Sequence, residues 1–137
     1  MDIMKIKRLI IFMIFSAFTV FPALSQEIPA NLLRDFQTGN SDGLSAHFNE
    51  RFELTITGTK YRVSKAQATQ ILREFFKNNP PTAFSILHKG NKTDSNFAVG
   101  KLVTKTNTYR VNIFFRKINE TNLIYLLEIE KENEAAI

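Results

Sequence analysis

The residues that could carry out acid–base chemistry are few in this sequence and form no known motif. The stretch GNSDGLSAHFNERFELTI (39–56) holds one histidine and three acidic residues, and a second histidine, His88, lies near the end of an expected strand. A small isomerase or dehydratase would use such a group as its general base, together with a hydrogen-bond donor that stabilises the oxyanion. His88 and Asp42 are therefore the candidate bases, and Tyr109 and Tyr125 are the candidate donors.

Each candidate also has a structural interpretation, which we favour. A lone histidine is usually a surface or hydrogen-bonded residue, and His47, beside Phe48, is interpreted as a packing or helix-end residue. Asp35 and Asp42 suit a helix cap or a solvated helix face. Ser64 fits a helix cap and has no G-x-S-x-G around it. The enzyme is therefore the alternative, and it requires His88, Tyr109 and Tyr125 to converge in one cavity.

Metal and thiol chemistry have no support in the sequence. There is no cysteine, so the chain has no disulfide, no thiolate nucleophile and no cysteine-ligated metal. The two histidines form neither H-x-H nor H-E-x-x-H. We expect no metal site and no cofactor.

The N-terminal segment has the pattern of a secretory signal peptide. Basic residues precede the apolar run LIIFMIFSAFTVFPAL (9–24), and Ala23-Leu24-Ser25 places small residues at both ends of an A-x-A-like cleavage site. We expect residues 1–25 to be cleaved before Gln26, leaving a soluble exported protein, periplasmic or secreted. An uncleaved membrane anchor is the alternative, but the run is short for a bilayer span and ends near a proline.

The remaining chain suits one domain of 26–131 followed by a frayed tail of 132–137. Loss of residues 1–25 removes three basic residues and one acidic residue, which lowers the net charge from +5 to +3. This excess is too small to argue for a nucleic-acid partner, and a basic strip through Arg110 and Arg116 is interpreted as a solvated sheet face.

Three helices are expected before and within the sheet. ANLLRDFQTG reads as a helix that ends at Gly39, and Asn40 or Ser41 can cap a second short helix. SKAQATQILREFFKNN has its apolar residues at helical spacing, with Ser64 and Gln67 forming a capping box.

Six strands are expected: a hairpin of RFELTIT and KYRV, and four segments joined by short polar links after the third helix. By alternation, the face turned to the helices is predicted to be apolar, with Glu53 and Glu128 on the other face. The possible ligand-contacting residues on the face turned to the helices are His88, Phe97, Tyr109, Phe115 and Tyr125. The outer face is predicted to carry an apolar patch for a partner. The residues that fall on this face are Leu87, Leu102, Phe114, Ile124 and Leu126, and the interface is expected at Leu102, Phe114, Ile124 and Leu126.

The element order resembles the NTF2-like (cystatin-like) cone, and is similar to the DUF4783 family of small exported bacterial proteins of unknown function. The segments that carry the resemblance are GNSDGLSAHFNERFELTITG, Tyr61, QILREFFKNNPP, FSILHKG and YRVNIFF. It implies an α+β fold in which helices pack on the concave face of a curved antiparallel sheet. Gly100, inside a strand, is a place where the sheet could bend. The resemblance also implies sheet-to-sheet dimers in this class, and it supplies no catalytic motif.

We therefore expect a non-catalytic module of the cell envelope that binds a small apolar ligand or a protein partner. A homodimer through the outer sheet face is the expected assembly, with no nucleic acid and no membrane contact after cleavage. The alternative is a small isomerase or dehydratase that uses His88 or Asp42 with a tyrosine donor.

Overall fold

A computed structural model describes residues 28–91 and 95–133 of the chain. The predicted signal peptide, residues 1–25, and most of the predicted tail lie outside the described residues. The elements follow in the order α2 (Ala30–Thr38), α3 (Ser41–Ser45), β1 (Phe48–Ile56), β2 (Thr59–Ser64), α4 (Lys65–Asn78), β3 (Pro81–Asn91), β4 (Ser95–Thr104), β5 (Thr108–Ile118) and β6 (Thr121–Lys131).

The helix boundaries follow from local sequence signals, as predicted. Gly39 ends α2 in the left-handed conformation (φ 69°), which glycine adopts without steric cost. The Asn40 side chain accepts a hydrogen bond from the Gly43 N–H and caps α3. Ser64 and Gln67 form the predicted capping box of α4, with both hydrogen bonds at 3.2 Å.

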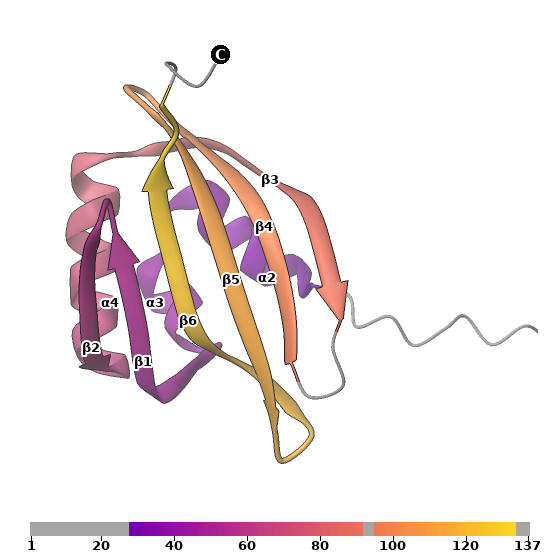
Figure 1. Ribbon diagram of the computed structural model, residues 1–137. Helices are drawn as coiled ribbons and strands as arrows, with labels where there is room; N and C mark the ends of the chain where they lie inside the picture. The colour runs from indigo at the N-terminus through magenta and orange to yellow at the C-terminus, as the bar shows by residue number, and fades with distance from the viewer. Residues whose placement is uncertain (1–27, 92–94, 134–137) are drawn as a thin grey trace, which may run out of the picture.

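The six strands form one sheet in the order β2-β1-β6-β5-β4-β3. Neighbours are antiparallel except β1 and β6, which are parallel and join the first hairpin to the last strand of the meander. In Figure 1 the helices lie behind the curved sheet and cover one of its faces. The α+β architecture is therefore as predicted, while the β1–β6 pairing is a long-range contact that no local pattern indicated.

Aromatic side chains fill the space between the helices and the sheet, which we call the inner side. Phe36 of α2 stacks on Phe84 of β3 with ring centroids 4.5 Å apart, and Phe48 stacks on Phe52 at 4.3 Å. All four rings are almost fully buried. The concave side is thus a packed hydrophobic core, whose burial supplies the main stabilising free energy of the domain.

The structure corrects the predicted direction of the β4 side chains. The residues predicted to face the helices, including Phe97 and Lys101, lie on the outer face, whereas Ala98 and Leu102 face inward and are 1% and 0% exposed. Leu102 was predicted as part of an outer-face interface, and that prediction is wrong. β4 carries apolar residues at both alternating sets of positions, so alternation alone could not choose between them.

Two β-bulges reverse further predicted directions. The pairing of β3 with β4 shifts between Ile86 and His88, opposite Gly100, so His88 lies on the outer face. In β6 the register with β5 shifts at Tyr125: Phe114 pairs with Leu126, Phe115 pairs with Ile124, and Tyr125 is the extra residue between them. Ile124 is therefore 0% exposed on the inner side, and its predicted place in the interface is also wrong.

Candidate functional site

The three residues required by the enzymatic alternative do not converge. His88 is exposed on the outer face, where its ring lies 5.6 Å from that of Phe97. Tyr109 is 4% exposed on the inner side, and its hydroxyl donates a hydrogen bond of 3.0 Å to Asn79 Oδ1. Because they lie on opposite faces of the sheet, His88 and Tyr109 cannot contact one substrate.

Tyr125 belongs to the outer face as well. The guanidinium carbon of Arg116 lies 4.6 Å from the centre of its ring, a cation–π arrangement. The ring of Phe114 lies 6.4 Å away on the same face. Tyr125 was predicted to face the helices, and the bulge at this residue explains the correction.

Asp42, the other candidate base, has a structural role. Its Oδ1 lies 2.6 Å from Nη2 of Arg73, an ion pair that ties α3 to α4. The Asp42 side chain is 74% exposed, so the carboxylate points to solvent rather than into a cavity.

The carboxylates of the strands lie on the outer face, as predicted. Glu53 is held at 3.5 Å by both Lys60 and Arg62 of β2. Glu128 pairs in register with Asn112 of β5. The residues on either side of Asn112, Val111 and Ile113, are buried in the core, so Asn112 and Glu128 point to the outer face.

Asp35 differs from its predicted place on a solvated helix face. It is only 9% exposed, and it accepts a hydrogen bond from Nδ2 of Asn40 at 3.3 Å. Its carboxylate also lies against Gly43, where an added Cβ would be 2.5 Å from Oδ2. Asp35 therefore fixes the α2–α3 connection from inside.

His47, interpreted from sequence as a packing residue, has the most unusual environment of the titratable groups. It connects α3 to β1, and its backbone carbonyl accepts a hydrogen bond from Ile124 N–H at 2.7 Å. Burial lowers the pKa of His47 below its ordinary value of 6.5, and the nearby charge of Asp35 opposes this shift. Within the described residues, its Nε2 atom is buried and has no hydrogen-bond partner.

A small cavity of about 80 Å³ lies next to His47. We call it the mouth cavity. Two of the predicted ligand-contacting residues, Phe97 and Phe115, are among those that line it. The others come from the residues just before α2 and from the ends of β3, β4 and β6, and they include Ile28, Pro29, Lys89, Asn96 and Asn122. Sequence reasoning missed His47 here because its position depends on how α3 and β1 meet β6, which local spacing does not encode.

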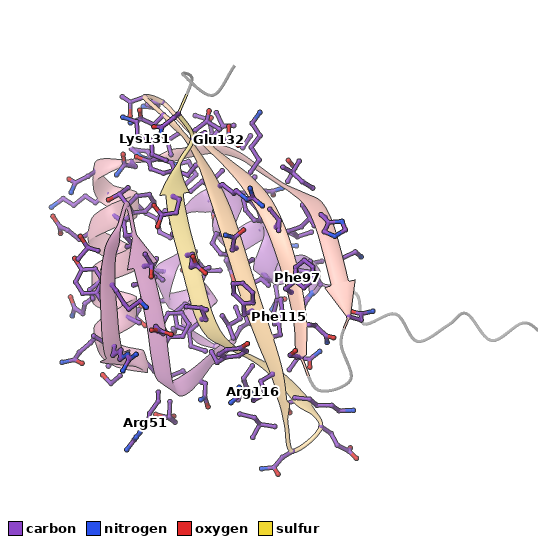
Figure 2. The ribbon with its side chains drawn as sticks, in the orientation of Figure 1. Arg51, Phe97, Phe115, Arg116, Lys131 and Glu132 are labelled. Carbon is purple, nitrogen blue, oxygen red and sulfur yellow. The ribbon has the colours of Figure 1, made fainter. Side chains whose placement is uncertain are left out.

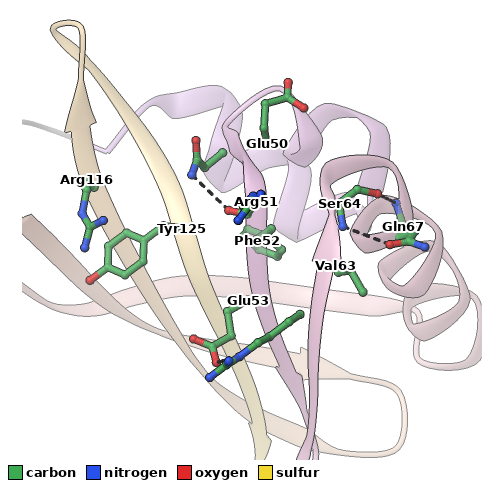
Figure 3. Close-up of a pocket in the computed structure, with 11 residues that line it drawn as sticks. Glu50, Arg51, Phe52, Glu53, Val63, Ser64, Gln67, Arg116 and Tyr125 are labelled. Atoms are coloured by element: carbon green, nitrogen blue, oxygen red, sulfur yellow. Dashed lines mark hydrogen bonds and ion pairs between the residues drawn. The ribbon is translucent and has the colours of Figure 1, made fainter.

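A second, wider depression of about 690 Å³ lies on the outer side, between β1, β2 and the Arg116–Tyr125 pair (Figure 3). Arg62 already binds Glu53, and Ser64 with Gln67 closes the capping box of α4. The arrangement holds charged groups in place but brings no general base beside a nucleophile or an oxyanion donor. It has the character of a solvated surface groove.

Among residues 28–91 and 95–133, no cluster of three or more histidine or acidic residues could hold a metal ion. In the same part of the chain, no helix is long and apolar enough to cross a membrane.

A six-stranded curved sheet with helices on its concave side defines the NTF2-like, or cystatin-like, class of α+β proteins. Within that class, the family model described as "Domain of unknown function (DUF4783)" matches residues 30–130, and the chain belongs to this family. The resemblance inferred from element order and spacing is thereby confirmed.

Solved structures of relatives agree with this assignment. A DUF4783 family protein from Bacteroides ovatus is 35% identical, with a TM-score of 0.76 over 80% of this chain and 100% of the relative. Another from Bacteroides uniformis is 30% identical, with a TM-score of 0.74 over 79% and 100% of the two chains. An NTF-2 like protein of unknown function from Silicibacter pomeroyi is 8% identical, with a TM-score of 0.57 over 74% and 87%, and shows the fold alone. No curated protein matches the chain.

Proposed function

We propose that this protein is a non-catalytic interaction module of the cell envelope that associates with a second copy of itself through the outer face of the sheet. The observation that carries the proposal is an apolar row across three adjacent strands. Phe97 of β4 pairs with Phe114 of β5, and Phe114 pairs with Leu126 of β6. All three side chains are half-buried on the face that the helices leave uncovered.

Charges beside this row favour a two-fold arrangement. Lys101 of β4 pairs with Arg110 of β5, and Arg110 pairs in turn with Glu130 of β6, the strand that also carries Glu128. In a face-to-face dimer with its axis near β5 and β6, the basic side of one copy meets the acidic side of the other. A two-fold contact of this kind satisfies both copies at once.

The sheet face is also large enough. The six strands, of which β2 has six residues and the others 9–11, form a face of roughly 30 by 25 Å at usual β spacings. That is close to the ~800 Å² per partner that a stable interface of standard size buries. The filled concave side supports the same proposal, because stacked aromatic rings occupy the place where an NTF2-like enzyme would need a substrate cavity.

Sedimentation equilibrium of the protein without residues 1–25 tests the proposed dimer. We expect a dimer at micromolar concentration, and Phe114→Glu should dissociate it by placing a charge in the apolar row. Leu87→Glu is the matched control, because Leu87 is 60% exposed at the edge strand and lies outside the row. A monomer at all concentrations, or dissociation by the control substitution alone, would refute the interface.

The envelope location rests on the basic, apolar and small-residue pattern of residues 1–25. N-terminal sequencing of the protein recovered from its host should begin at Gln26. An N-terminus at Met1 in the envelope fraction would favour the uncleaved anchor, and recovery from the cytosol would overturn export altogether.

A further inference from the structure

The mouth cavity combines three features that together describe a binding site. It is partly enclosed, its wall contains apolar side chains, and a buried imidazole nitrogen beside it has no partner in the described part of the chain. A buried polar atom without a hydrogen bond costs about 1–3 kcal/mol. Ordered water or a ligand that hydrogen-bonds to this nitrogen would remove that cost.

The charges around the mouth cavity favour an anion. Lys89 pairs in register with Ala98, which is 1% exposed on the inner side, so Lys89 leaves β3 toward the cavity rather than toward the outer face. The residues that line the cavity include no aspartate or glutamate. The nearest acidic group acting on His47 is Asp35, whose carboxylate is engaged by Asn40 and lies against Gly43.

The start of α2 adds to the positive potential. Ile28 and Pro29, which line the cavity, immediately precede this nine-residue helix. Pro29 occupies the N-cap position and provides no side-chain hydrogen bond to the helix. The first turn of α2 contains no acidic residue. Within the described residues, the first turn therefore offers no acidic group of its own to the positive end of the helix dipole. Figure 1 shows this end of α2 beside the C-terminal end of β3.

The apolar part of the cavity wall indicates that the uncharged part of the ligand is also apolar. Phe115 is 7% exposed on the inner side, and Ile28 packs against the core. A volume of about 80 Å³ accommodates a chain of only a few carbon atoms. A ligand with one charged end and a short apolar body matches this combination.

We propose that the mouth cavity binds a short-chain monocarboxylate, with its apolar chain against Phe115 and Ile28 and its carboxylate near Lys89, the start of α2 and His47 Nε2. Phe97 lines this cavity and also belongs to the proposed apolar row, but the ligand contacts proposed here do not include it, so either proposal can fail without the other.

Titration of the protein lacking residues 1–25 with sodium butyrate, followed by two-dimensional NMR, tests the site. We expect saturable shifts of His47 and Phe115 resonances, with butanol binding at least about fivefold more weakly because it lacks the charge. Lys89→Gln should weaken butyrate about tenfold, as expected for a charge-assisted hydrogen bond, and leave butanol unchanged. Lys105→Gln, an exposed change in the β4–β5 turn, is the matched control and should alter neither.

Equal binding of butyrate and butanol would overturn the anionic class, and shifts confined to residues outside the cavity would overturn the site. Absence of any saturable shift up to 100 mM butyrate, chosen as roughly a hundred times a millimolar dissociation constant, would refute the proposal outright. All of these measurements are independent of oligomeric state, so a protein that fails to dimerise can still pass them.

Discussion

The ring of Phe84 occupies the space beside Gly100 in which a larger residue would place its side chain. A Cβ built on Gly100 would lie 2.5 Å from Cζ of Phe84. Phe84 cannot easily move away, because its ring stacks on Phe36 and is 5% exposed. The glycine thus permits helix α2 to contact the sheet through a pair of aromatic rings.

Gly100→Ala is therefore expected to lower the free energy of unfolding by about 1–3 kcal/mol through overpacking. Urea denaturation followed by circular dichroism measures the change. In the double variant Gly100→Ala/Phe84→Leu the loss should be smaller than the sum of the two single losses, since the shorter side chain relieves the clash. Additive losses would show that the close approach does not cause the effect.

The hydrogen bond between Tyr109 and Asn79 links β5 to the end of α4. Tyr109→Phe removes the hydroxyl donor and leaves Oδ1 of Asn79 without this hydrogen bond. We therefore expect the free energy of unfolding to fall by about 1 kcal/mol. The ring itself should stay in place, because it packs edge-on against Phe75 at 5.2 Å. Tyr61→Phe in β2 is the matched control, and an equal loss there would argue that the Tyr109 hydroxyl has no special role.

The ion pair between Asp42 and Arg73 is expected to contribute little to stability. Both side chains are at least half exposed, so solvent and salt screen the interaction, and Asp42→Asn should cost no more than ~1 kcal/mol. The cost should shrink further in 1 M sodium chloride. A loss of several kcal/mol, independent of salt, would mean that Asp42 has another role in the fold.

Protonation of His47 should destabilise the protein. Because burial lowers the pKa of His47 in the folded state, the unfolded chain binds the proton more readily, and the free energy of unfolding falls as the pH decreases below about 6.5. His47→Gln should flatten this part of the pH profile in urea denaturations between pH 5 and 8. His88→Gln is the control, and a profile that responds to His88 instead would disprove the assignment.

Local sequence signals determined which elements form and where the helices end. Gly39, Asn40 and the Ser64–Gln67 pair act within one turn of their own helix, so their effect needs no other part of the chain. The element order in turn was sufficient to identify the class of fold and the family.

Tertiary structure decided which way several strands face and therefore what can form a site. β4 has apolar residues at both alternating sets of positions, and its pairing with β5 selects Ala98 and Leu102 for the core. The bulges before His88 and at Tyr125 each add one residue to a strand and reverse the direction of the side chains that follow. Such shifts depend on the partner strand rather than on the local pattern.

The mouth cavity was hidden from the sequence for the same reason. His47, Lys89 and Phe115 are far apart along the chain, and only the curvature of the sheet and the seating of α2 bring them to one place. The sequence by itself therefore determined the helices, the strands and their order. Tertiary packing determined which side of the sheet each side chain faces and where the cavities form, because both depend on strand registers set between distant segments.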